Sequence, residues 1–253
     1  MSGGRARPGS AQAAILFEQG TARDFARALD SYEELVRMVG AKKKIENEIG
    51  LLNRWWMNDL PKLDSLHANE LSKCARFKMT RGKMRPLQKL VDSNEEIEVG
   101  RVSEQAFLSL RQGKWKKGVE ELSELKGVGV ATATFIACRI APQLCPFMAD
   151  EALEGCGYPR DYSMKVWEQF RRELVDKAAR LNEDEGAGRW SAEDVGRSLW
   201  CAAMMSVFGI DDGENDNGNI ESPTKSNKST SNSVRGGEDV GSSAKRRRVA
   251  TKQ

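Results

Sequence analysis

The chain has 253 residues, of which 39% are apolar, so it is long enough to bury the core of one large or two small domains. No apolar run approaches the ~18 residues that a membrane-spanning helix needs, which excludes a membrane as a partner. The formal net charge of +3 excludes a uniformly basic protein, so an anionic partner is expected to meet a local basic patch.

The cysteine and histidine content argues against a metal centre. The five cysteines are an odd number without Cys-x-x-Cys spacing, and His67 is the only histidine. Zinc sites and iron–sulfur clusters need several such ligands at close spacing. We therefore expect no metal and no cofactor bound through these side chains, and we expect the cysteines to be reduced core thiols.

Hydrophobic periodicity predicts an all-α fold, since no alternating strand pattern is found. Residues 1–20 are predicted to be a flexible N-terminus, and residues 21–209 a helical domain. One helix is expected from Phe25 to Val39, ended by Gly40, and a second from Ile45 to Trp56. Further helices are expected at about 70–79, 86–91, 102–112, 116–125, 133–140, 151–155, 162–181 and 191–207.

A basic run lies at a predicted junction between two helices. Residues 71–91 contain seven Lys or Arg and no Asp or Glu. The side chains around the junction are Arg76, Lys78, Arg81, Lys83 and Arg85. A solvated helix face is one interpretation, but the absence of neutralising acids favours a patch that contacts phosphates.

A glycine turn follows in the segment Leu125-Lys126-Gly127-Val128-Gly129, directly before a predicted helix. Two glycines allow a tight turn with outward N–H groups, and the helix adds its own unpaired N–H groups and positive dipole end. This combination is typical of a phosphate cradle. The alternative is a turn that uses glycine only to reverse the chain.

Residues 210–253 are rich in Asp, Asn, Ser, Gly and Lys, which predicts a disordered tail. The tail contains a basic cluster of the kind found in nuclear import signals: Lys245, Arg246, Arg247 and Arg248. An import receptor and a nuclear location are therefore expected. Nonspecific binding of nucleic acid is the alternative for such a cluster.

The segment LKGVGVATATFIA followed by PFMADE resembles the helix-hairpin-helix of the DNA glycosylase superfamily. Thr132 and Ala133 match the Thr-Ala pair of that motif, and Pro146 follows at the expected spacing. The resemblance covers residues 125–151. Together with RFKMTRGKMRP upstream, the pattern also resembles an uncharacterised eukaryotic family.

The resemblance implies a multi-helix DNA-binding domain and roles for particular residues. The hairpin, Lys126, Gly127, Val128 and Gly129, would grip a DNA phosphate, and its carbonyl groups would hold a monovalent cation. Asp150, with Glu151 as the substitute, would act on the sugar of a base flipped out of the duplex. A carboxylate at this position is otherwise an ordinary helix cap.

The chain departs from the superfamily pattern at two positions. Asp150 lies four residues after Pro146, and Ala149 occupies the usual aspartate position. Ala131 occupies the position of the lysine that forms a Schiff base in bifunctional members, so lyase chemistry at that position is excluded.

Three functions remain open. The first is a nuclear, monofunctional hydrolase of N-glycosidic bonds in DNA, acting in base excision repair. The second is a non-catalytic DNA- or chromatin-binding module, and the third is a helical protein-interaction domain. The tryptophans Trp55, Trp56 and Trp115 are either a base-stacking platform or core residues. The position of Asp150 separates the first two, because an enzyme needs that carboxylate in a cleft beside the hairpin.

Overall fold

The computed structural model describes residues 9–83, 85–185 and 190–210, which all lie in one compact unit, residues 1–212. These residues form twelve α-helices and one 3₁₀ helix and contain no strand, which confirms the all-α prediction for them. No helix in this part of the chain is long and apolar enough to cross a membrane. The disordered tail and the import cluster, Lys245 to Arg248, were predicted outside the described residues.

The helices are α1 (Ser10–Gln19), α2 (Ala22–Asp30), α3 (Tyr32–Lys43), α4 (Glu46–Asn58), η1 (Leu60–Lys62), α5 (Ala68–Arg81), α6 (Gln88–Val91), α7 (Glu96–Arg111), α8 (Trp115–Leu122), α9 (Val130–Ile140), α10 (Asp150–Gly155), α11 (Met164–Glu185) and α12 (Ala192–Phe208).

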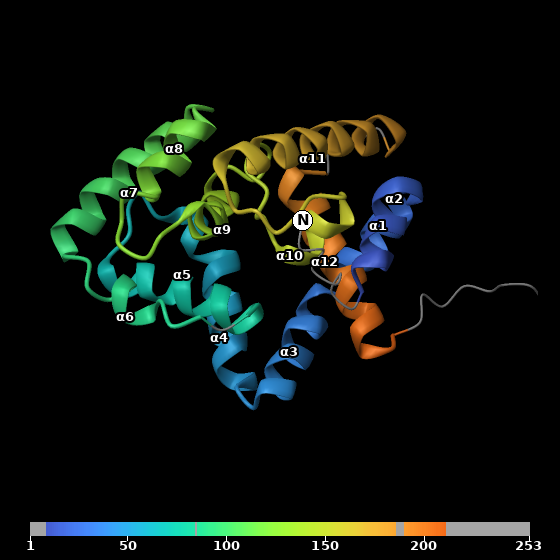
Figure 1. Ribbon diagram of the computed structural model, residues 1–253, viewed down its shortest axis with the longest axis horizontal. Helices are drawn as coiled ribbons and strands as arrows, with labels where there is room; N and C mark the ends of the chain where they lie inside the picture. The colour runs from blue at the N-terminus through green and yellow to red at the C-terminus, as the bar shows by residue number, and fades with distance from the viewer. Residues whose placement is uncertain (1–8, 84, 186–189, 211–253) are drawn as a thin grey trace, which may run out of the picture. The chain divides into compact units, whose positions relative to one another are not determined.

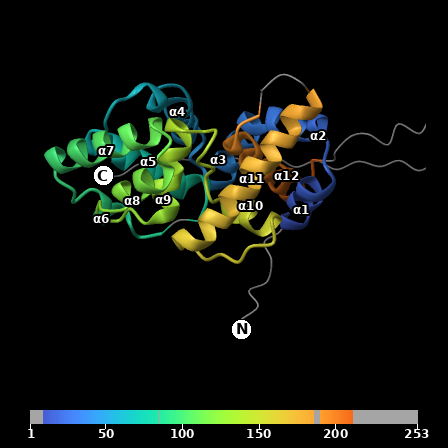
Figure 2. The ribbon, with the colours of Figure 1, turned by 90° about the horizontal axis from the view of Figure 1, so that it is seen from above.

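The helices form two lobes (Figures 1 and 2). The terminal lobe combines both ends of the described chain, because α1 packs against α10 and α12, and α2 and α11 also pack against α12. The middle lobe contains α4 to α9, in which α5 contacts α4, α6 and α9, and α7 packs against α8. Helix α3 contacts α4, α5 and α12 and so joins the lobes.

An aromatic cluster fills the core of the middle lobe. Trp56 is fully buried and stacks on Phe135, with 4.7 Å between ring centroids. Its indole N–H donates to the Phe135 carbonyl at 3.1 Å, and Phe77 packs edge-on against both rings. Trp56 is therefore a core residue and not an exposed stacking platform.

Two helix boundaries differ from the expectation. The single helix predicted from Phe25 to Val39 is two helices, because the chain turns at Ser31, whose hydroxyl donates to the Arg27 carbonyl at 3.2 Å. Gly40 does not end α3, which continues to Lys43. A Cβ on Gly40 would lie 2.4 Å from Ile49 Cγ2, so this glycine is needed for the close packing of α3 and α4.

The N-terminal segment also differs, because residues 10–19 form α1 where a flexible segment was expected. Ala13 is fully buried against Gly155 of α10, where an added Cβ would lie 2.8 Å from the Ala13 Cβ. Small residues make this close approach possible, although they give a weak helical pattern in the sequence. Residues 1–8 lie outside the described part of the chain.

The packing of α3 on α4 predicts that Gly40→Ala lowers the free energy of unfolding by about 1–3 kcal/mol, because the new methyl group overlaps Ile49 and the backbone of Glu46. Gly50→Ala is the matched control, since a Cβ on this exposed glycine of α4 meets no atom within 4 Å. That variant should be unchanged or up to ~1 kcal/mol more stable. Urea unfolding of both variants measures the difference, and equal effects would contradict the proposed packing role.

Candidate nucleic-acid interface

A cavity of about 260 Å³ brings together three features that are separate in the sequence. The end of α5 and the loop after it contribute Lys78, Arg81, Lys83 and Arg85. The glycine turn contributes Gly127 and Gly129, together with the first residues of α9. The remaining wall contains residues 147–151, which include Asp150 and Glu151, as well as Tyr162 and Trp200.

The glycine turn has the geometry that the sequence predicts. Gly127 has φ +76°, a left-handed conformation that favours glycine, and the Val128 N–H donates to the Leu125 carbonyl at 3.0 Å. An added Cβ on Gly127 would lie 2.8 Å from Val91 Cγ2. The fold itself therefore requires this glycine, both for its backbone conformation and for its packing on α6.

Gly129 is different, because the fold places no steric demand on it. It has φ −88° and ψ 177°, and an added Cβ would meet no described atom within 4 Å. It is the N-cap of α9, and its own lack of a side chain leaves that helix end without a side-chain cap hydrogen bond. The backbone N–H groups at the start of α9 therefore border the cavity beside an open position.

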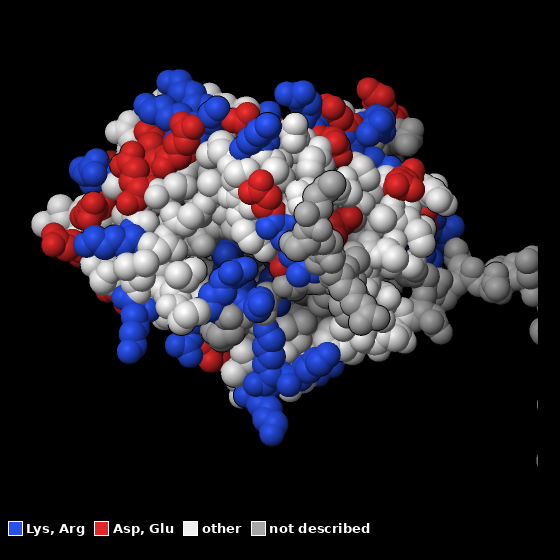
Figure 3. Space-filling view, in the orientation of Figure 1, with Lys and Arg blue, Asp and Glu red and all other residues white. Residues whose placement is uncertain are grey.

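The exposed basic residues of the interface lie at the rim of the cavity. Lys83 and Arg85 are exposed, and the Arg85 guanidinium lies 5.8 Å from the ring centroid of Tyr162. Lys43 of α3 binds the end of α5. Its ammonium donates to the Thr80 carbonyl and, at 2.7 Å, to the Gly82 carbonyl. Figure 3 shows Lys and Arg side chains gathered over the end of α5 and over the turn between α3 and α4.

Arg81 lies inside the protein, although the sequence gives it the same character as its basic neighbours. It is only 6% exposed, and its guanidinium lies 4.1 Å from the Trp200 ring centroid and 5.3 Å from that of Tyr32. Among the described residues, its Nε and Nη1 atoms are buried without a hydrogen-bond partner. Arg81 is thus a buried, incompletely paired cation in the wall of the cavity.

Three residues that were grouped with the interface do not line the cavity. Arg76 is exposed on α5 and forms an ion pair with Glu48 of α4. The Lys126 side chain is exposed, while its backbone N–H and carbonyl both bond to the Asn94 side chain. Val128 is 3% exposed and belongs to the core.

The two carboxylates line the same cavity as the basic residues. Asp150 is the first residue of α10, whose N-cap is Ala149, and one of its carboxylate oxygens accepts a hydrogen bond from the Tyr162 hydroxyl at 2.6 Å. Glu151 is 6% exposed and also borders the cavity. Asp150 therefore lies in a cavity beside the glycine turn, which is the position that the hydrolase hypothesis requires.

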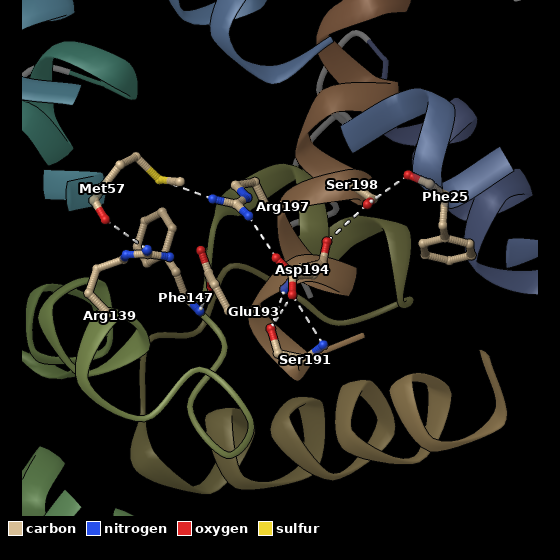
Figure 4. Close-up of polar contacts among 9 residues, drawn as sticks. All are labelled: Phe25, Met57, Arg139, Phe147, Ser191, Glu193, Asp194, Arg197 and Ser198. Carbon is tan, nitrogen blue, oxygen red and sulfur yellow. Dashed lines mark hydrogen bonds and ion pairs between the residues drawn. The ribbon is translucent and has the colours of Figure 1, made fainter. Parts of the chain in front are cut away.

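A buried polar network positions the segment that leads to Asp150 (Figure 4). Glu193 of α12 is 2% exposed, and its carboxylate accepts the Phe147 N–H at 2.9 Å. Burial raises the pKa of Glu193. The positive charges of Arg197 and Arg139, which lie on either side of it in Figure 4, partly oppose this rise. Arg197 also bonds to Asp194 at 2.6 Å, and Arg139 donates to the Met57 carbonyl at 3.1 Å.

The described residues contain no cluster of His, Cys, Asp or Glu suited to a metal ion. All five cysteines are free, and burial raises the pKa of the Cys145 thiol to about 12. The carbonyls of Leu125, Lys126 and Gly129 in the hairpin already accept hydrogen bonds from the protein. The monovalent cation that the resemblance implies there stays a prediction.

The sequence did not reveal every residue of the cavity. Tyr162 and Trp200 both line it, yet neither belongs to a recognisable motif. Lys43, which binds the end of α5, was not predicted to belong to the interface. A signal for Lys43 did exist, because three consecutive lysines at residues 42–44 form a second basic run.

Comparison of the chain with protein-family models, with curated proteins and with solved structures finds no match. The functional argument therefore depends on the geometry of the cavity and on the short resemblance described above.

The buried network predicts that Glu193→Ala lowers the free energy of unfolding by about 3–5 kcal/mol, because it leaves the Phe147 N–H unpaired and the arginines uncompensated. Glu193→Gln should lose less stability, since its amide oxygen still accepts the Phe147 N–H. Glu33→Ala, which removes an exposed carboxylate of α3, is the control and should change stability by less than about 0.5 kcal/mol. Denaturant unfolding of the three variants tests the order.

Proposed function

We propose that this protein binds DNA through the cavity and its basic rim, and that it hydrolyses N-glycosidic bonds as a glycosylase that lacks the Schiff-base lysine of the family position, here Ala131. The observation that carries the proposal is the single cavity lined by the glycine turn, the start of α9, four basic side chains and the Asp150–Glu151 pair. The backbone N–H groups and exposed cations suit a phosphodiester strand, and the enclosed part suits a base extruded from the duplex.

The charges of the cavity support a nucleic-acid ligand. Lys78, Arg81, Lys83 and Arg85 carry four positive charges against the two carboxylates of Asp150 and Glu151. A strand would meet the cations at the rim with its phosphates, while the carboxylates would face the sugar and base inside. A helical domain that binds proteins through an apolar surface would need no such arrangement, so the protein-interaction hypothesis is less well supported.

A non-catalytic DNA- or chromatin-binding module is the second candidate. Two observations favour it: the Tyr162 hydroxyl already occupies one oxygen of Asp150, and Ala131 replaces the lysine of bifunctional glycosylases. Nuclear import through Lys245 to Arg248 is also proposed, on the sequence of this cluster. Its deletion from a fluorescent fusion would redistribute the protein if the cluster is needed.

Binding to a duplex oligonucleotide should weaken steeply as salt increases, because phosphate contacts release counterions. Lys83→Ala combined with Arg85→Ala should reduce the slope of log K against log [salt] by about two, since each contact contributes about 0.9. Arg111→Ala combined with Lys117→Ala removes the same charge from α7 and α8 and is the control. Fluorescence anisotropy measures the slopes.

The same DNA-binding measurement is made on the variant Gly129→Ala. The methyl group should not disturb packing, because it meets no described atom within 4 Å, but it should weaken binding if a phosphate approaches the start of α9. A salt-independent affinity, or equal slopes for both double variants, would refute binding through this surface.

Catalysis is tested with duplexes that carry uracil, alkylated bases or oxidised bases. A hydrolase should release one of these bases, and Asp150→Asn should slow release by about 10²-fold or more. Asp30→Asn, at an exposed position at the end of α2, is the matched control and should keep full activity. Binding without release of any base would leave the non-catalytic module as the function.

A further inference from the structure

Lys78 is a partly buried amine in the wall of the cavity. It lies in the last turn of α5, one turn before Arg81, and therefore on the same side of the helix. Among the described residues, its ammonium makes no hydrogen bond or ion pair within 4 Å. A lysine that only stabilised the fold would be expected to pair with a carboxylate or a carbonyl oxygen.

The groups around Lys78 come from several elements. Arg85 in the loop after α5 repels its positive charge, and Asp150 at the start of α10 attracts it. Arg81, Lys83, Glu151 and the Tyr162 hydroxyl line the same cavity. Burial is the largest influence and, with Arg85, lowers the pKa of Lys78 to about 8, although Asp150 opposes the change. With this pKa, roughly a tenth of Lys78 is the neutral, nucleophilic amine at pH 7, far more than for a lysine with the ordinary pKa of 10.5.

Lys126 provides the contrast within the same interface. It belongs to the glycine turn, but its side chain is exposed and does not line the cavity. Position 131, at the start of α9, is an alanine. Lys78 and Lys83 both line the cavity with Asp150, but Lys83 is exposed in the loop after α5, so Lys78 is the partly buried amine of the two.

We propose that Lys78 is an amine nucleophile that condenses with the aldehyde of a ring-opened abasic deoxyribose held in the cavity, giving the protein a lyase activity on abasic DNA. This proposal rests on the proposed binding of DNA to the same cavity. It does not require the protein to release a base, since abasic sites also arise from spontaneous loss of bases.

The reaction is balanced without an added oxidant or reductant. The neutral amine of Lys78 attacks C1′ of the aldehyde and a C–N bond forms. The carbonyl oxygen takes one proton from the amine and one from solvent and leaves as water, which gives an iminium ion. The iminium makes the C2′ protons acidic, and the Asp150 carboxylate accepts one of them. The electron pair moves into a C2′–C3′ double bond, and the C3′–O bond breaks with the phosphate as leaving group. Water then hydrolyses the iminium and regenerates the lysine.

The experiment is borohydride trapping with the full chain and a duplex that contains one abasic site. Borohydride reduces the iminium to a stable secondary amine, so a covalent protein–DNA adduct should form, and peptide mapping of the wild-type adduct should locate it at Lys78. Lys78→Met and Lys78→Arg should lose the adduct, whereas Lys126→Met should keep it. An adduct at any other residue would overturn the proposal, whichever variants fold.

Binding of the same proteins to a duplex with a tetrahydrofuran abasic analogue, which has no aldehyde, separates the two proposals. Bound protein that forms no adduct with the natural abasic site would overturn the role of Lys78 and leave the DNA-binding function intact. Failure to bind either duplex would overturn both. Lys78→Met is expected to remain folded, because it replaces an unpaired, partly buried ammonium with an apolar side chain of similar length. Because the variant also removes a positive charge from the cavity, its adduct yield is compared with that of the wild type at equal fractions of bound duplex.

The dependence of trapping on pH is a further readout that a structural lysine would not affect. Lys78 must be neutral to react, so the initial rate of adduct formation should rise with pH up to about 8 and then level off. An exposed lysine would instead show a rate that continues to rise toward its ordinary pKa of 10.5. A profile of the second kind would contradict the assignment to Lys78.

Discussion

A carboxylate buried near three arginines constrains how the two lobes of this protein pack. Glu193 comes from α12 of the terminal lobe, whereas Arg139 and Arg81 come from α9 and α5 of the middle lobe. Charges removed from water are costly unless opposite charges and hydrogen bonds surround them. Separation of the lobes would remove Arg139 and Arg81 from Glu193 and leave it with Arg197 of its own helix. The same cluster therefore fixes the relative position of the walls between which the cavity lies.

The cluster also connects stability to the chemistry of the cavity. Glu193 binds the backbone at Phe147, and the residues that follow directly form the acidic wall. The Arg81 guanidinium lies beside aromatic faces, with two nitrogen atoms that have no hydrogen-bond partner in the described protein. Lys78 adds a second cation without a hydrogen bond in the described chain. Such groups reduce the stability of the free protein, and binding of an anionic ligand would offset part of that cost.

The sequence predicted the helical fold and three parts of the cavity, because each of these depends on local patterns. Helical periodicity, the glycine turn before α9 and the run of basic residues can all be read within a few positions of one another. The burial of Arg81 could not be predicted in this way, because it depends on Tyr32 and Trp200, which are distant in the chain. Gly40 was misread for a related reason. A glycine that ends a helix and a glycine that permits close packing on Ile49 look alike until the partner helix is placed.

The packing of α1 and α2 on α10 and α12 has a consequence for the order of folding. The helices of the middle lobe make their main contacts with one another and with α3, within residues 32–140, so this lobe can begin to fold before α12 is available. The apolar faces of α1 and α2 must remain uncovered until α12 has left the ribosome. Ser10 and Ala13, buried against helices from the other end of the described chain, are among the last to find their native partners. Helix α1 is therefore among the last of the described helices to become protected from solvent.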